Sequence, residues 1–291
     1  MSGSGEPPEL PSTTRCAVGQ LFRQYAAFDH QRNRLEASTL AEAKEAALSA
    51  SDDVDTMLGP AALIHFFDDL DVDLLCLAAL AFAWLGRWQH PCYCTRAEFE
   101  RAVRYALWGR LQPHSNNEIE LSFIWPAEPS VLVERLRAGF PDAVLSSALT
   151  SSEAFLDFYL FAFDYNQTSP YRRCLSLADA RWLWRQLLGE PGCVGAFRSE
   201  SSTGSSKTEC SLTRSWRYLE RFDAYLDTLS ADDTTITRDT WYWVLVFAQR
   251  TQHDHSDLLE VYDRDGAWPL LLDGFVRFLL EQQHADASLG T

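Results

Sequence analysis

The chain has 291 residues, of which 46% are hydrophobic and 13% aromatic, so it can bury a large core in one or two domains. Its 41 acidic residues outnumber 25 basic ones, and the formal net charge of −16 repels phosphate backbones and argues against nucleic-acid binding. The longest apolar run, residues 74–85, is shorter than the roughly 20 residues that cross a bilayer. We therefore expect a buried helix there and no membrane partner.

The N-terminal part predicts a tail and then an insertion. Residues 1–13 have neither an apolar signal core nor a glycine after the initiator, so we expect a flexible tail without a secretion or lipid signal. Residues 29–55 are rich in alanine and glutamate and hold few large apolar side chains. This composition indicates a surface insertion that is partly helical.

An acidic run, DDLDVD at residues 68–73, has the spacing of a calcium loop only in part. Counted from Asp69, acids fall at loop positions 1, 3 and 5, but Leu74 stands where the loop needs glycine. Leu80 stands where the loop needs a bidentate glutamate. We predict a solvated acidic cluster, and keep a calcium-binding regulator of EF-hand type as an alternative.

Residues 90–107 hold a short metal-like motif and then a clear helix. His90, Cys92 and Cys94 form HxCxC, whose cysteines stand closer together than those of structural zinc pairs. We expect no metal and no cofactor. Thr95 and Glu98 form a capping box before an amphipathic helix. The apolar face of that helix consists of Phe99, Ala102, Val103, Ala106 and Leu107.

The second half also follows a helical period. Apolar spacing predicts helices from about residue 176 to 188, from behind Thr237, and from Pro269 onward. Two segments interrupt them: the proline-containing stretch 112–130, a plausible boundary between halves, and the low-complexity stretch 199–211. Residues 284–291 form a second tail. Because no convincing alternating strand appears, the predicted fold class is all-α, a helical bundle.

Two acids stand at the starts of predicted helices. Asp239 and Asp273 are stabilised there by the helix dipole, and they also present a negative edge to a partner. The sequence contains no GxSxG, no HExxH and no phosphate-cradling glycine loop. We expect no catalytic residues, although an all-α enzyme whose site is invisible in one sequence remains an alternative.

Several motifs resemble the potentiating-neddylation domain of the defective-in-cullin-neddylation family. In the second half these are FLDFYLFAF (155–163), ADARWLWRQLL (178–188), ITRDTW (236–241) and YDRDGAWPLLLDGFV (262–276). In the first half they are LGPAALIHFFDDLDVD (58–73), AFAW (81–84) and TRAEF (95–99). The resemblance covers residues 14–283 as a divergent member. It implies an EF-hand-like half (14–111) and a helical C-terminal half (131–283).

The resemblance implies an accessory ligase factor with no chemistry of its own. Such a protein holds the C-terminal winged-helix region of a cullin and the charged neddylation conjugating enzyme together, which speeds transfer of the modifier by orientation. The alternative within this fold is a diverged protein-binding scaffold without neddylation activity.

The family's cullin-binding residues fall on Asp239, Ala267 and Asp273. Two acids that flank a small residue would give a flat negative surface for a basic partner. Gly274 departs from the family pattern, which commonly has a second acid there, and this weakens the expected negative charge.

The family's second site is an apolar pocket for the acetylated N-terminal methionine of the conjugating enzyme. By position, the pocket would be lined by Leu63, Ala79, Leu80, Ala83, Cys92, Cys94 and Tyr165. Several of these side chains are smaller or more polar than is usual in the family, so we expect altered selectivity.

The remaining expectations concern location and assembly. The seven cysteines form no CxxC pair, which favours a reducing compartment, the cytoplasm or the nucleus. We expect a monomer that depends on its two protein partners for its location.

Overall fold

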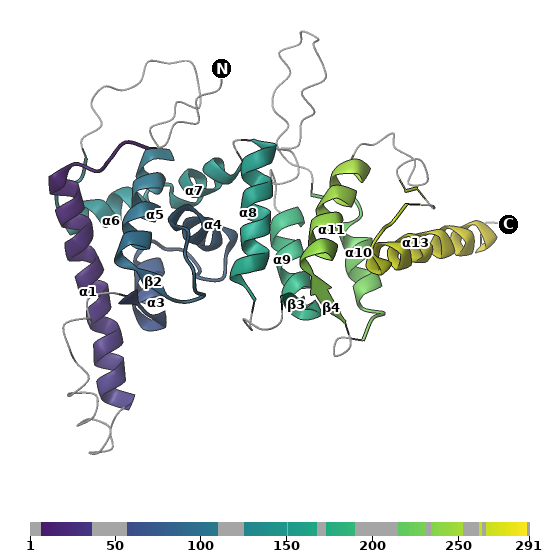
Figure 1. The fold of residues 1–291 in the computed structure, drawn as a ribbon, viewed down its shortest axis with the longest axis horizontal. Coiled ribbons are helices and arrows are strands. Elements are labelled where there is room, and N and C mark those ends of the chain that lie inside the picture. The colour runs from purple at the N-terminus through teal and green to yellow at the C-terminus, as the bar shows by residue number, and fades with distance from the viewer. Residues whose placement is uncertain are drawn as a thin grey trace, which may run out of the picture. The chain divides into compact units, whose positions relative to one another are not determined.

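The structure is a computed structural model (Figure 1). It describes residues 7–36, 57–109, 125–149, 151–167, 173–189, 215–230, 234–252, 262–263 and 266–289. The chain folds into two compact units, Met1–Ala148 and Leu149–Thr291, and both are mainly helical. The predicted all-α class is confirmed. Among the described residues no helix is both long enough and apolar enough to cross a membrane.

In the described part of the first unit, six helices pack around an aromatic core. The elements are α1 (Ser12–Glu36), β1 (Met57–Leu58), α3 (Pro60–Asp69), α4 (Leu77–Gly86), β2 (Cys94–Thr95), α5 (Arg96–Gly109), α6 (Pro129–Arg137) and α7 (Phe140–Ala148). Phe82 of the fully buried α4 lies at the centre, with ring centroids 5.5 Å from Phe66, 6.3 Å from Phe99 and 5.3 Å from Phe140. These edge and tilted contacts fix how α3, α5 and α7 pack on α4.

Local signals in this unit agree with the sequence, with one shift. The Thr95 backbone N–H donates to the Glu98 carboxylate (2.8 Å) and the Glu98 N–H to the Thr95 hydroxyl (3.3 Å), so the predicted capping box is present at the start of α5. The buried helix expected over residues 74–85 begins later, at Leu77. Asp73 accepts the backbone N–H of Leu75 and holds a turn there, and Leu75 is 69% exposed.

The boundary between the units lies further along the chain than the segment 112–130. Helices α6 and α7, residues 129–148, contact α1, α4 and α5 and so belong to the first unit. Their apolar side chains Leu132, Leu136 and Phe140 are buried there. Proline content marks a break in secondary structure, and it does not reveal which core the following helix joins. Of the insertions predicted over 29–55, 112–130 and 199–211, residues 37–55, 112–124 and 199–211 lie outside the described residues.

The second unit is built around two tryptophans. Its elements are α8 (Ser152–Tyr165), β3 (Cys174–Ser176), α9 (Leu177–Gly189), α10 (Leu219–Leu226), β4 (Thr235–Thr237), α11 (Arg238–Thr251) and α13 (Leu270–Leu289). Trp184 and Trp241 stack with centroids 5.2 Å apart, and both indoles lie against Tyr159. Trp184 donates to the Tyr159 hydroxyl, which in turn donates to the Trp241 carbonyl, each over 2.9 Å. Burial raises the pKa of Tyr159 well above its ordinary value, so this phenol stays a neutral donor.

Two short antiparallel pairs of strands were not predicted from the sequence. β1 pairs with β2, and β3 pairs with β4 in the register Cys174 to Thr237 and Ser176 to Thr235. Strands of two or three residues are too short to produce an alternating pattern. The β3–β4 pair nevertheless matters, because it joins the segment that leads into α9 to the segment that leads into α11.

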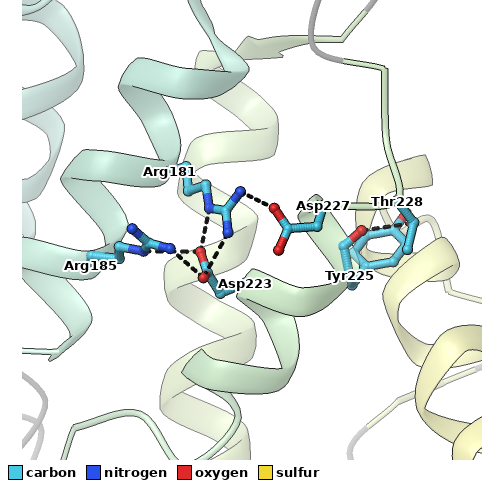
Figure 2. A network of polar contacts seen from close by, with 6 residues as sticks. All are labelled: Arg181, Arg185, Asp223, Tyr225, Asp227 and Thr228. Carbon is cyan, nitrogen blue, oxygen red and sulfur yellow. Dashed lines mark hydrogen bonds and ion pairs between the residues drawn. The ribbon is translucent and has the colours of Figure 1, made fainter.

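An arginine–aspartate network joins α9 to α10 (Figure 2). Arg181 and Arg185 of α9 both bind the two carboxylate oxygens of Asp223, and Arg181 also binds Asp227. The hydrogen bonds from Arg181, and then those from Arg185, lower the pKa of Asp223 to about 2. Nearby, the backbone N–H of Trp216 donates to the carbonyl of Leu188 (2.8 Å), so the end of α9 lies beside the segment that leads into α10.

Candidate partner-binding surface

The first turn of α11 presents Asp239 to solvent. Thr237 caps the helix, because its hydroxyl accepts the backbone N–H of Thr240 (3.2 Å). Arg238 forms a bidentate ion pair with Asp164, with nitrogen–oxygen distances of 3.2 and 3.3 Å. Asp239 lies in this first turn, where the helix dipole favours a negative charge, and its side chain is exposed.

Trp268 fixes the loop before α13 onto α11. Its ring packs edge-on against Trp243 (5.3 Å) and Phe247 (5.8 Å) of α11, with the Arg250 guanidinium 5.7 Å from its centre. Its indole N–H donates to the backbone carbonyl of Asp263 (3.0 Å), so the ring also closes its own loop. The neighbouring Ala267 is consequently held at a defined place, and it is exposed.

Asp273 is held by the same aromatic side chains. It lies in the first turn of α13, and one of its carboxylate oxygens accepts the hydroxyl of Tyr262 over 2.6 Å. The ring of Tyr262 stacks on Trp268 with centroids 5.9 Å apart. The two partners are eleven positions apart in the chain, so no local spacing predicts this hydrogen bond. Asp273 is therefore oriented as well as half-buried.

The three predicted cullin-binding residues thus surround one aromatic cluster, defined here as Trp243, Phe247, Tyr262 and Trp268. Asp239 lies one helical turn before Trp243, Ala267 adjoins Trp268, and Asp273 binds Tyr262. The result is an exposed small residue with a carboxylate on either side. Such a surface can bind a basic protein segment closely.

Comparisons with known proteins agree with this geometry. A sequence model of the family described as Cullin binding matches residues 142–278. DCN1-like protein 5 of Homo sapiens is 24% identical over 77% of this chain and 71% of its own length. The chain is thus similar to DCN1-like proteins over most of its length. DCN1-like protein 4 of Danio rerio is also 24% identical, over 79% of the chain and 62% of that relative. Over 62 residues, the Defective in cullin neddylation protein 1 of Cryptococcus neoformans is 32% identical.

The cullin-binding match and the similarity to DCN1-like proteins support a role in cullin neddylation with a cullin as partner. The matched segment contains the whole surface described above, from Asp239 to Asp273.

The residues predicted to line the conjugating-enzyme pocket have two kinds of environment. Five of the six in the first unit are buried: Leu63, Ala79, Leu80, Ala83 and Cys94. Burial raises the pKa of the Cys94 thiol far above its ordinary value, so it behaves as a small apolar side chain. Cys92 is exposed with a positive φ of 61°. Tyr165, in the second unit, stacks on Phe161 with centroids 5.1 Å apart.

The acidic run of the first unit lies at a shallow hollow of about 550 Å³. Asp68, Asp71 and Asp73 border it together with Ile64, Val72 and Leu74. Within the described part of the chain, no group of three or more histidine, cysteine or acidic side chains is arranged to hold a metal ion.

Proposed function

We propose that this chain promotes cullin neddylation by holding the C-terminal winged-helix region of a cullin on the surface formed by Asp239, Ala267 and Asp273. The observation that carries the proposal is the arrangement of these residues around one aromatic cluster, with both carboxylates at helix starts. A rigid negative surface of this kind favours a basic partner in one orientation. The family match supports the identity of that partner.

The contribution to the reaction is orientation. A bound cullin whose acceptor lysine is fixed near the thioester of the conjugating enzyme loses less entropy on the way to the transition state. The chain then needs no nucleophile or general base of its own, and we propose that it acts as an accessory factor and not as an enzyme.

We further propose that the chain binds the acetylated N-terminus of the conjugating enzyme through Leu63, Ala79, Leu80, Ala83, Cys92, Cys94 and Tyr165. Support comes from the apolar character of five of these side chains, which lie buried in the first unit. Affinity for acetylated and unacetylated N-terminal peptides of the enzyme can be compared by calorimetry. Tighter binding of the acetylated peptide is expected, and equal affinities would remove the selective pocket.

The cullin-binding proposal is tested with the triple variant Asp239→Ala, Ala267→Arg and Asp273→Ala. Binding to the C-terminal fragment of a cullin from the same organism should weaken by about 100-fold or more, because two charges are lost and a bulky like charge faces the partner. The rate of modifier transfer should fall in parallel.

The matched control is Glu220→Ala. Glu220 is also an exposed acid in the first turn of a helix of the same unit, α10, away from the three residues. Its loss should leave cullin binding unchanged. If the triple variant binds as well as the wild type, the surface has no part in cullin recognition. If binding is lost with the triple variant but the wild type never accelerates transfer, the chain is a cullin-binding scaffold without neddylation activity.

A further inference from the structure

Five consecutive apolar residues, 267–271, lead into α13, and none of them is fully buried. Ala267 and Leu270 are exposed, while Trp268, Pro269 and Leu271 are half-buried. Leu270 is 87% exposed, the highest value among the exposed large hydrophobic side chains of the described residues. A run of this length on a surface costs solubility and invites aggregation unless it serves binding.

The packing of α13 does not explain Leu270. The helix buries Leu272, Phe275, Val276 and Leu279, which recur with the helical period on one face. Leu270 lies two residues before Leu272, and at 100° per residue it points to nearly the opposite side. A polar residue there would leave the core of the unit unchanged.

The apolar run continues onto α11. Tyr242 is 38% exposed and packs edge-on against Trp243 with centroids 5.8 Å apart, and Trp243 in turn contacts Trp268. We name Tyr242, Trp243 and residues 267–271 the apolar strip. Asp239 lies three residues before Tyr242, and Asp273 lies three residues after Leu270. The strip is therefore bounded by a carboxylate at each end.

We infer that Leu270 is the apolar anchor of the cullin-binding surface and inserts into an apolar hollow flanked by basic side chains on the cullin. This inference rests on the function proposed above. It follows from the continuity of the strip with Asp239 and Asp273, and from the charge that these acids require in the partner. Aromatic and aliphatic side chains at the centre of an interface supply most of its affinity, and charges at the rim supply speed and register.

The two kinds of residue should therefore control different rate constants. Loss of a buried leucine side chain raises the dissociation rate, whereas loss of a rim charge slows association and reduces its dependence on salt. The test is a kinetic comparison of full-length variants on an immobilised cullin C-terminal fragment, at low and at physiological ionic strength. The variants are Leu270→Ala, the pair Asp239→Asn with Asp273→Asn, and the control Leu75→Ala.

Leu270→Ala should raise the dissociation rate about 10- to 100-fold, with an association rate within about 3-fold of the wild type and an unchanged salt dependence. Its thermal unfolding should not change, since the side chain is exposed. The control Leu75→Ala removes an equally apolar side chain, 69% exposed in the first unit, and should have no effect.

The outcomes separate the inference from the function on which it rests. If the aspartate pair weakens binding but Leu270→Ala binds within about 2-fold of the wild type, the anchor is refuted and the cullin-binding surface stands. The anchor role is also refuted if Leu270→Ala slows association and reduces the salt dependence of the association rate. The residue would then behave as part of the charged rim. If neither variant weakens binding, the proposed surface fails and the anchor fails with it.

Discussion

Gly274 shows how one neighbour decides which residue a binding surface can carry. Its position directly follows Asp273, where the family resemblance led us to expect a second acid. The structure supplies a reason for its absence. A Cβ atom at residue 274 would overlap the hydroxyl of Tyr225 and lie 3.0 Å from the Cζ atom of that ring. Tyr225 is itself held by Phe275 (5.8 Å) and Phe278 (5.7 Å), so it cannot easily move away.

Gly274→Ala should consequently destabilise the protein by about 1–3 kcal/mol, although the same change in an open helix position stabilises. Urea unfolding gives the free energy. The matched background is Tyr225→Phe, which removes the overlapping oxygen and keeps the ring. There the alanine substitution should cost clearly less, and an equal cost in both backgrounds would show that the hydroxyl is not the obstacle.

Residue-scale features could be predicted where their partners are close in sequence. The capping box of Thr95 and Glu98 and the cap of Thr237 are local, and each could be predicted before the structure was known. The bond from Tyr262 to Asp273 and the contact of Trp268 with Trp243 depend on how a loop folds back on α11, and no periodicity encodes that. The acids at the helix starts could be predicted from the sequence, and the structure adds what holds them.

At the scale of elements, ion pairs join α9 to α10 beside the buried contact of Trp184 with Phe222. Asp223 lies between Arg181 and Arg185, with its side chain 22% exposed, so solvent screens part of the attraction. Because its pKa is lowered to about 2 from an ordinary value near 3.8, ionised Asp223 stabilises the folded state fully above that ordinary value. The contribution is lost as the pH falls from there towards 2.

Asp223→Asn should therefore cost about 1 kcal/mol at neutral pH, after allowance for screening. The difference from the wild type should shrink to about half by pH 3, because much of the unfolded wild type has then taken up a proton. Chemical unfolding at a series of pH values measures this, with Glu220→Gln on the same helix as control. A difference that stays constant from neutral pH to pH 3 would assign the effect to packing.

The elements themselves were predictable to different degrees. α9 and α11 begin within a residue or two of the predicted positions, since caps and apolar periods are strong signals. The short strands β3 and β4 were not predicted, because three residues cannot display a period. The sequence analysis assigned most of α6 and all of α7 to the C-terminal half, whereas these helices pack in the first unit. The choice between two cores depends on long-range packing.

On the scale of the whole molecule, the proposed cullin surface belongs to one unit. Asp239, Ala267 and Asp273 all lie in Leu149–Thr291, which has its own core around Trp184 and Trp241. A unit with its own core can in principle fold alone.

The fragment of residues 149–291 should thus be helical, unfold cooperatively and bind the cullin C-terminal fragment with an affinity within about 3-fold of the full chain. Circular dichroism and calorimetry check both parts, and the fragment of residues 1–148 serves as the control that does not bind. Cullin binding that requires both fragments would place part of the recognition site in the first unit.

The hydrogen bond between the Trp216 backbone N–H and the Leu188 carbonyl has a practical consequence. It holds the end of α9 against the segment that leads into α10, so the two helices are joined here by a backbone bond. The free-energy cost of closing a chain segment rises by only about 0.6 kcal/mol for each doubling of its length. A change in the number of residues between 188 and 216 should therefore cost little while the side chains of the proposed cullin surface stay in place, which makes this stretch the natural place to insert a reporter.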